Sequence, residues 1–444
     1  MDEIQGHPYW RATYDKSGHL VGDDPSGDIK AADVEHLFVF AHGWNNSTGS
    51  AEDLFQSMFG SMAEAAQSHP TLGKIGFVGV FWPSIWFPEP SAAQSPSVAK
   101  ASVAGHPGQA DAAVTGAAIA ASLKDSYPGQ GAALDSLGKL IDDGLAAAKA
   151  GDVSDAVQSA NVEQFHTQLR GLVSNATTAE LDNGESALVD ADNGQQAYKT
   201  LADTMGSAPP GGDEESLGDV FGKVWSGAKS AMRVASYLEM KTRAGNIGHA
   251  GLGPMLESLH AGSPQLKVHL VGHSFGARLV SYALSGTGTS EQSPVASVTL
   301  LQGAFSHWAF AQADQMPFGV AGPLCNVRDR VSGPVLSTFS QHDWAVGIWY
   351  PKASFMADQM VESTEAASKW GGMGSDGAQS VPGPGAALML EESGHPYQLQ
   401  AGEFYRFDSN SVIKDTTQSS FAGAHSDIRH AQVAWLPVCA AAGL

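Results

Sequence analysis

The sequence predicts an α/β fold with a mostly parallel central sheet, interrupted by a large helical insertion. A buried strand, a helix and a second buried strand follow one another within residues 36–82, and a strand, a sharp turn and a helix fill 267–286. Strand, helix and strand in this order form a βαβ unit, whose strands lie parallel in one sheet. The third observation is a change of composition, because residues 88–225 are rich in Ala, Gly and Ser.

The composition indicates a globular protein with a strongly acidic surface. The chain has 444 residues, 43% of them hydrophobic, and 24 basic against 46 acidic residues give a formal net charge of −22. Such a charge repels nucleic acid and anionic headgroups at long range. We therefore expect a soluble protein that does not bind nucleic acid.

Signals for a membrane, a metal or a disulfide framework are weak. The N-terminal residues MDEIQGHPYW lack the basic start and apolar run of a signal peptide, and no stretch has the length of a membrane-spanning helix. We expect a cytoplasmic protein, or a secreted one without a visible signal peptide. Cys325 and Cys439 could form one bridge or remain thiols, and we expect no metal and no cofactor. The oligomeric state stays open.

The first part of the core is predicted from its alternation and its apolar runs. The first 30 residues alternate polar and apolar types around YWRATYDKSGHLVGDD (9–24), which is typical of a short antiparallel hairpin. Residues 36–43 and 75–82 are apolar runs without helical periodicity, which indicates buried parallel strands. Between them, residues 51–67 place apolar side chains at helical spacing.

The Ala/Gly-rich region divides the chain into three segments. Residues 132–150 and 162–173 have the pattern of amphipathic helices. We therefore interpret the region as a helical cap, although a partly disordered linker has a similar composition. The predicted organisation is 1–87 for the first part of the core, 88–225 for the insertion and 226–444 for the rest of the core.

The second part of the core returns to alternating strands and helices. Its predicted elements are helices at 225–245 and 253–262, the strand–turn–helix at 267–286, strands within 295–305, 335–347 and 403–413, and a loop followed by a helix within 421–438.

The strongest chemical signal is Gly272-His273-Ser274-Phe275-Gly276, between an apolar strand and a helix. This G-x-S-x-G pattern places a serine on a tight, strained turn, where the glycines let the backbone pack closely. The hydroxyl then projects above the sheet edge, beside the positive end of the helix. The alternative is a glycine-rich turn with a serine cap. We interpret Ser274 as a nucleophile.

Over residues 36–85 and 226–438 the chain resembles the α/β-hydrolase superfamily, in its serine esterase and lipase branch. The resemblance implies a mostly parallel sheet with helices on both faces and a triad in the order serine, acid, histidine. It also implies cleavage of a small-molecule or lipid ester without a cofactor. A peptidase or amidase on the same fold, and a hydrolase-like binding protein without activity, remain alternatives.

The segment AHGWNN, directly after the first core strand, resembles the superfamily's oxyanion loop. The resemblance implies backbone N–H donors at Trp44 and at Phe275, which would stabilise a developing oxyanion. We expect the side chain of His42 to support the loop. The alternative is a strand-ending turn whose Asn residues satisfy backbone groups.

The acid is assigned to Asp343, because it follows the predicted strand VLSTFS (335–340) where the superfamily places its triad carboxylate. A helix N-cap is the alternative role, since aspartate is favoured there. Asp314 and Asp358 are rival acids.

The base is assigned to His425, which lies in a loop between the last predicted strand and the C-terminal helix, as in the superfamily. His430 is the main competitor, although we expect it inside the helix; His395 and His342 are weaker ones. Asp427 could pair with His425 or cap the helix.

Aromatic residues gather near strand ends, where open α/β sheets bind ligands. Trp82, Trp86 and Trp344, together with His42, are therefore candidates for substrate binding. The alternative is that the aromatic residues attach the cap to the core.

Overall fold

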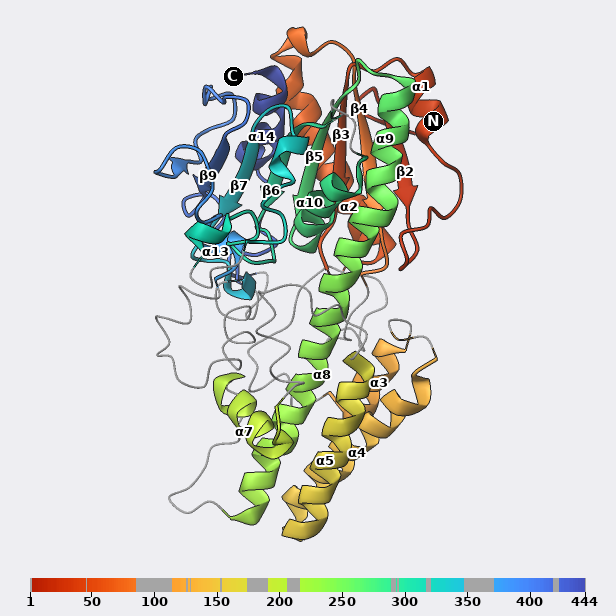
Figure 1. Ribbon diagram of the computed structural model, residues 1–444, viewed down its shortest axis with the longest axis vertical. Helices are drawn as coiled ribbons and strands as arrows, with labels where there is room; N and C mark the ends of the chain where they lie inside the picture. Colours follow the sequence, from red (N-terminus) through yellow and green to blue (C-terminus); the bar gives the residue numbers. More distant parts are fainter. Residues whose placement is uncertain are drawn as a thin grey trace.

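The computed structural model shows an α/β core and a separate group of helices, joined by one long helix (Figure 1). The structure describes residues 2–44, 46–84, 114–124, 127, 129–151, 154–173, 191–205, 216–288, 293, 295–316, 321–346, 371–417 and 423–443.

The core is built on a nine-stranded sheet of order β1-β2-β4-β3-β5-β6-β7-β9-β8. Only the β1–β2 pair is antiparallel, and the other neighbouring strands run parallel. The predicted mostly parallel sheet is thus confirmed. The strands are β1 Asp2–Ile4, β2 His7–Thr13, β3 His36–Ala41, β4 Ile75–Phe81, β5 Lys267–His273, β6 Val295–Leu301, β7 Val335–Phe339, β8 Leu388–Met389 and β9 Phe404–Asp408.

Helices cover both faces of the sheet because alternate strand residues point to opposite sides. In β3, Leu37 and Val39 belong to one apolar cluster, whereas Phe38 and Phe40 belong to the other. The first cluster packs under α1 Ser26–Ala31, α9 Gly253–Gly262, α10 Phe275–Gly286 and the end of α8 Leu217–Ile247. The second packs under α2 Thr48–Gln67 and α14 Ala431–Ala442. The short helix α13 Met373–Asp376 lies beside β7.

A third apolar cluster holds the helical group together, away from the sheet (Figure 1). Its helices are α3 Gly116–Leu123, α4 Gly131–Ala150, α5 Asp155–Val173, α7 Gly194–Met205 and the first half of α8. The helices approach closely where side chains are small: a Cβ on Gly144 would overlap the indole of Trp225. These described parts of the insertion are helical, as the amphipathic pattern predicts.

Helix α8 passes from the helical group into the core without a break. Phe221 and Ala235 belong to the helical cluster, whereas Met240 and Ile247 belong to a core cluster. The predicted segment boundary at 225 therefore falls inside a continuous helix.

Most predicted elements are present with small shifts. An N-terminal hairpin is present, but it is formed by β1 and β2 ahead of most of the segment 9–24 where it was expected. The helix expected at 51–67 begins three residues earlier, where Ser47 accepts a hydrogen bond from the Ser50 N–H. The helix expected from 225 begins at Leu217, because Ser216 and Asp219 form a reciprocal capping box. That S-x-x-D signal was available in the sequence.

Candidate active site

Ser274 occupies the sharp turn between β5 and α10, with φ 59° and ψ −121°. A non-glycine residue with positive φ is strained, and such strain gathers at functional sites. The Ser274 N–H donates to the carbonyl of Leu301 at the end of β6, which ties the turn to the sheet. The sequence pattern and the observed geometry agree on a strand–turn–helix that presents a serine.

The flanking glycines allow the backbone to turn this tightly. A Cβ on Gly276 would lie 2.0 Å from the carbonyl oxygen of Ala41, and one on Gly272 would lie 2.4 Å from that of Gly276. Real Cβ atoms do not approach backbone this closely, so β3, β5 and α10 could not keep their present spacing with side chains there.

Gly276→Ala is therefore expected to destabilise the protein by about 1–3 kcal/mol or more, because overpacking here displaces backbone and not a flexible side chain. Chemical denaturation measures the loss. Gly385→Ala is the matched control, since a Cβ there meets nothing within 4 Å. Equal stability of the two variants would contradict the tight packing of this turn.

The structure brings together the three side chains that the sequence analysis assigned to a triad. The Oγ of Ser274 lies 2.8 Å from Nε2 of His425, and Nδ1 of His425 lies 2.8 Å from Oδ2 of Asp343. The two loops that carry the acid and the base are joined directly, because Asp343 and Gly423 form a β-bridge and the Ala424 N–H donates to the carbonyl of His342.

The surroundings of Asp343 determine which ring nitrogen of His425 carries the proton. The Asp343 side chain is fully buried, and its Oδ1 accepts from the Val346 N–H at 3.1 Å. Since a carboxylate can only accept, the His425 Nδ1 must carry the proton. The bare Nε2 therefore accepts the hydroxyl proton of Ser274, which is the arrangement a general base requires.

The loop after β3 lies directly against the nucleophile. The sheet register pairs Ala41 with Gly272, and a Cβ on Gly43 would lie 2.7 Å from the Cβ of Ser274. The rings of Trp44 and Phe275 are 6.0 Å apart. The Phe275 N–H is the first of α10, where a helix offers no intrahelical acceptor. The two predicted oxyanion donors thus belong to the residue after Gly43, which packs against Ser274, and to the residue after Ser274 itself.

His42 supports this loop from inside. Its Nδ1 donates to the carbonyl of Gly43 at 2.8 Å, its Nε2 accepts from the Trp82 N–H, and its ring stacks on the Trp82 indole. Both side chains are buried, and the Trp82 Nε1–H donates to the carbonyl of His42. These contacts agree with the expectation that His42 supports the loop, and they occupy the polar atoms of both His42 and Trp82.

Of the other two tryptophan candidates, only Trp344 lies within the described residues. Trp344 is half-buried, and its ring lies so close to Gly423 that a Cβ there would be 2.8 Å from it. This places Trp344 between the loops of the acid and the base. Trp86 lies outside the described residues.

The rival acids and bases lie elsewhere in the described structure. His430 is the residue before α14 and not inside it, and its Nε2 bonds to Asp427 at 2.8 Å. Asp427 also accepts from the N–H groups of Lys414 and Asp415, so it orders the loop and pairs with His430 instead of His425. Asp314 is exposed in a short 3-10 turn. Asp358 lies outside the described residues. Among the described hydrogen bonds, the backbone of His342 bonds to Ser340 and Ala424, and the carbonyl of His395 accepts from the Trp435 indole.

His273, the second residue of the G-x-S-x-G turn, is a site residue to which the sequence pattern assigned no role. Its Nε2 donates to the main-chain carbonyl of His425 at 2.9 Å. Burial lowers the pKa of His273 to about 3, and burial lowers that of His42 to about 4. Both imidazoles are therefore neutral near pH 7. The signal that could have found His273 is a polar residue inside an otherwise apolar strand end.

These two depressed pKa values predict acid sensitivity. The unfolded chain takes up a proton at each histidine below the ordinary pKa of 6.5, but the folded protein does so only near 4 and 3. Their contribution to the free energy of unfolding is therefore fully present above pH 6.5. Below that pH it falls by about 1.4 kcal/mol per pH unit for each group, until the folded protein also takes up the proton.

We expect His273→Leu to reduce the slope of stability against pH by about 1.4 kcal/mol per pH unit, because the contribution of His273 is removed while those of the other buried histidines, such as His36 and His269, remain. Urea unfolding at several values below the ordinary histidine pKa measures it. Val21→Ala, at an exposed side chain that does not titrate, should leave the slope unchanged. A His273→Leu slope equal to that of the wild type would contradict the prediction.

Cys325 and Cys439 are not joined by a disulfide, and burial raises the pKa of the Cys439 thiol to about 11. Among the described residues, no group of three or more His, Cys, Asp or Glu side chains could hold a metal ion. Within the same residues, no helix combines the length and the apolar character needed to cross a bilayer.

Compared with protein-family models, with curated proteins and with solved structures, the chain matches none of them. The functional argument therefore depends on the geometry of the site.

Proposed function

We propose that this protein is a serine hydrolase that cleaves carboxylic esters through an acyl-enzyme intermediate, on an α/β-hydrolase fold. The observation that carries the proposal is the continuous chain of hydrogen bonds from Asp343 through His425 to Ser274, each 2.8 Å long. The serine lies on a strained turn after β5, the acid follows β7 and the histidine follows β9. This chain order, with the acid and the base at the ends of neighbouring strands, supports the fold assignment.

In the first step Ser274 attacks the ester carbonyl while His425 Nε2 takes the hydroxyl proton. Asp343 stays ionised and stabilises the imidazolium. The backbone N–H groups of Trp44 and Phe275 bind the oxyanion, and loss of one such donor costs about 3–4 kcal/mol of the barrier. The C–O bond to the alcohol then breaks, and His425 returns the proton to the leaving oxygen.

In the second step water attacks the acyl group on Ser274, with His425 again acting as the base. The acid is released and the serine regains its proton. No cofactor enters this cycle. An ester is favoured over an amide because an alkoxide leaves more readily than an amine anion, so less protonation is needed in the transition state.

The surroundings of the nucleophile favour an apolar substrate group. Ser274 is only 4% exposed, and the rings of Trp44 and Tyr237 flank Phe275 beside it. Tyr237 belongs to α8, the helix that continues into the helical group. We propose that this aromatic wall contacts the substrate and that the helical insertion covers the site as a cap. Trp344 is the remaining described candidate for substrate contact.

Parallel assays of p-nitrophenyl esters with different acyl chains and of matched p-nitroanilides test the proposal. Ester turnover with little anilide turnover supports it. Faster anilide turnover would replace the ester assignment with an amidase or peptidase. Absence of both turnover and labelling by a fluorophosphonate probe would replace the proposal with that of a binding protein that lacks hydrolytic activity.

A further inference from the structure

Gln302 is a buried polar residue in a strained conformation beside the proposed triad. It follows β6 directly, its side chain is fully buried and its φ is 47°. Both features cost free energy, since a buried amide must be hydrogen-bonded and a non-glycine residue rarely adopts positive φ. Such costs persist where surrounding interactions compensate for them.

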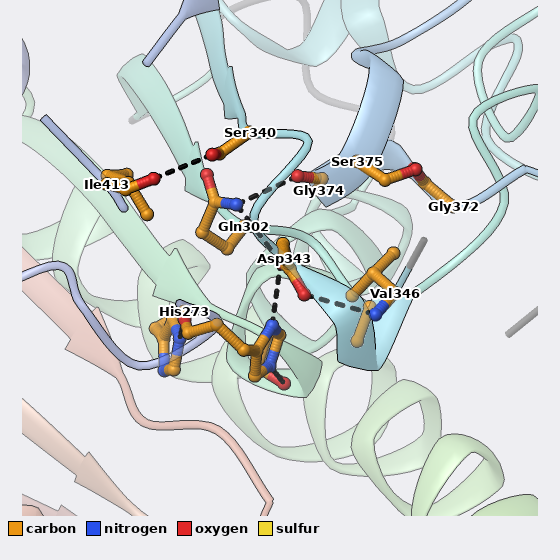
Figure 2. A network of polar contacts seen from close by, with 12 residues as sticks. His273, Gln302, Ser340, Asp343, Val346, Gly372, Gly374, Ser375 and Ile413 are labelled. Carbon is orange, nitrogen blue, oxygen red and sulfur yellow. Dashed lines mark hydrogen bonds and ion pairs between the residues drawn. The ribbon is translucent and has the colours of Figure 1, made fainter. Parts of the chain in front are cut away.

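Hydrogen bonds fix the orientation of the Gln302 amide. Its Nε2 donates to Oδ2 of Asp343 at 3.0 Å and to the carbonyl of Gly374 at 2.8 Å (Figure 2). The hydroxyl of Thr338 accepts from the Gln302 N–H at 3.1 Å, so its own proton is available for Gln302 Oε1 at 2.9 Å. Because the Gly374 carbonyl can only accept, the NH₂ group must face Asp343.

Asp343 Oδ2 therefore accepts two hydrogen bonds, one from His425 and one from Gln302. The geometry points to Gln302 as a positioning residue: it holds the Asp343 carboxylate in the orientation that fixes the tautomer of His425. This inference rests on the proposed function. The competing explanation is that Gln302 merely fastens α13 to the sheet through Gly374.

Two substitutions separate these explanations. Gln302→Met keeps the length of the side chain but removes the donor, and we expect kcat to fall about 10²-fold with little change in KM, because a small misplacement of the base is costly. Gln302→Glu introduces a carboxyl that donates to Asp343 only while it is protonated. Its ionisation places two like charges together and displaces Asp343.

The Gln302→Glu variant should therefore show a pH signature. The ratio of its kcat to that of the wild type should be highest at the acidic end of the accessible range and fall at least about tenfold as the introduced carboxyl ionises. The described titratable groups on the elements around this network include Asp343, His342, His425, His273, Asp376 and His307, and on β9, which pairs with β7, Tyr405, Arg406 and Asp408. All of them are present in both proteins, so the ratio reports the introduced carboxyl.

Gln312→Glu is the matched control, because Gln312 donates to the carbonyl of Cys325 away from the triad. It should give a ratio that does not change with pH. Thermal unfolding at each pH establishes that the assayed variants are folded.

If both Gln302 variants fail to fold, Thr338→Val and Thr338→Ser take their place. Thr338→Val loses the hydroxyl that orients the Gln302 amide and should lose activity. Thr338→Ser keeps that hydroxyl and should retain activity.

The outcomes distinguish the two proposals. A wild type that hydrolyses esters, with folded Gln302→Met and Gln302→Glu variants of unchanged kcat and a flat ratio, overturns the inference and leaves the proposed function standing. Wild-type activity of Thr338→Val would likewise overturn the inference about Gln302 and leave the proposed function standing. A wild type without hydrolysis or serine labelling overturns the proposed function, and this inference with it.

Discussion

Ser274→Ala is expected to abolish covalent labelling by a fluorophosphonate and to lower kcat for p-nitrophenyl esters by about 10⁶-fold, the loss typical of removing the nucleophile of a serine hydrolase. In the labelling reaction the Ser274 oxygen bonds to phosphorus and fluoride leaves, so the probe requires the hydroxyl itself. Alanine keeps the Cβ, and the backbone at φ 59° therefore remains under the same constraint in both proteins. The expected loss is chemical and not a consequence of unfolding.

Ser285→Ala provides the comparison, since Ser285 is exposed on the same helix, where its hydroxyl donates to the carbonyl of Tyr282. It should keep full labelling and turnover. Labelling of Ser274→Ala to the wild-type level, located by mass spectrometry at another serine, would remove Ser274 from the proposed reaction.

The strands and helices of the core were predictable because each carries a local signal. β3 and β4 are apolar runs that the sheet buries completely, and α4 was expected within one residue of its observed start. The start of α8 differs from the predicted one because the capping box at Ser216 and Asp219 begins the helix ahead of the expected apolar pattern. Caps are set by a few polar atoms, which hydrophobic periodicity does not record.

The three side chains proposed to react were also predictable, Ser274 from the G-x-S-x-G turn, and Asp343 and His425 from the positions that the resemblance to α/β-hydrolases implies. The partners that orient them were not. Gln302 and His273 act on Asp343 and on the His425 carbonyl across 41 and 152 positions of sequence. Nothing local distinguishes such a residue from any polar residue at a strand end until the sheet brings the strands together.

His42 and Trp82 show that a position at a strand end does not determine which way a side chain points. Their positions near strand ends favoured contact with substrate, but the stacked rings and their hydrogen bonds turn both side chains inward. Placement at the ligand-binding edge of a sheet is a property of the backbone. Whether a side chain there faces the ligand or the core depends on contacts that the sequence pattern does not contain.

Asp343→Asn is the second substitution with a large expected effect, and kcat should fall about 10⁴-fold. Oδ2 of Asp343 faces two donors, the His425 Nδ1–H and the Gln302 NH₂, while Oδ1 faces the Val346 N–H. An asparagine has one acceptor oxygen, so either orientation of its amide sets an NH₂ group against a donor. With the NH₂ toward His425, the imidazole must shift its proton to Nε2, where it can no longer accept the proton of Ser274.

Asp33→Asn is the matched control, because Asp33 is 95% exposed and has φ 52°, a conformation that asparagine tolerates. It should leave kcat unchanged, whereas Asp343→Asn should retain its fold and some slow labelling by the phosphonate, since Ser274 and the backbone donors remain. Steady-state kinetics and labelling rates measure both variants. A loss of kcat below about tenfold in Asp343→Asn would mean that the buried carboxylate does not set the tautomer of His425, because the wrong tautomer alone costs about 10⁴.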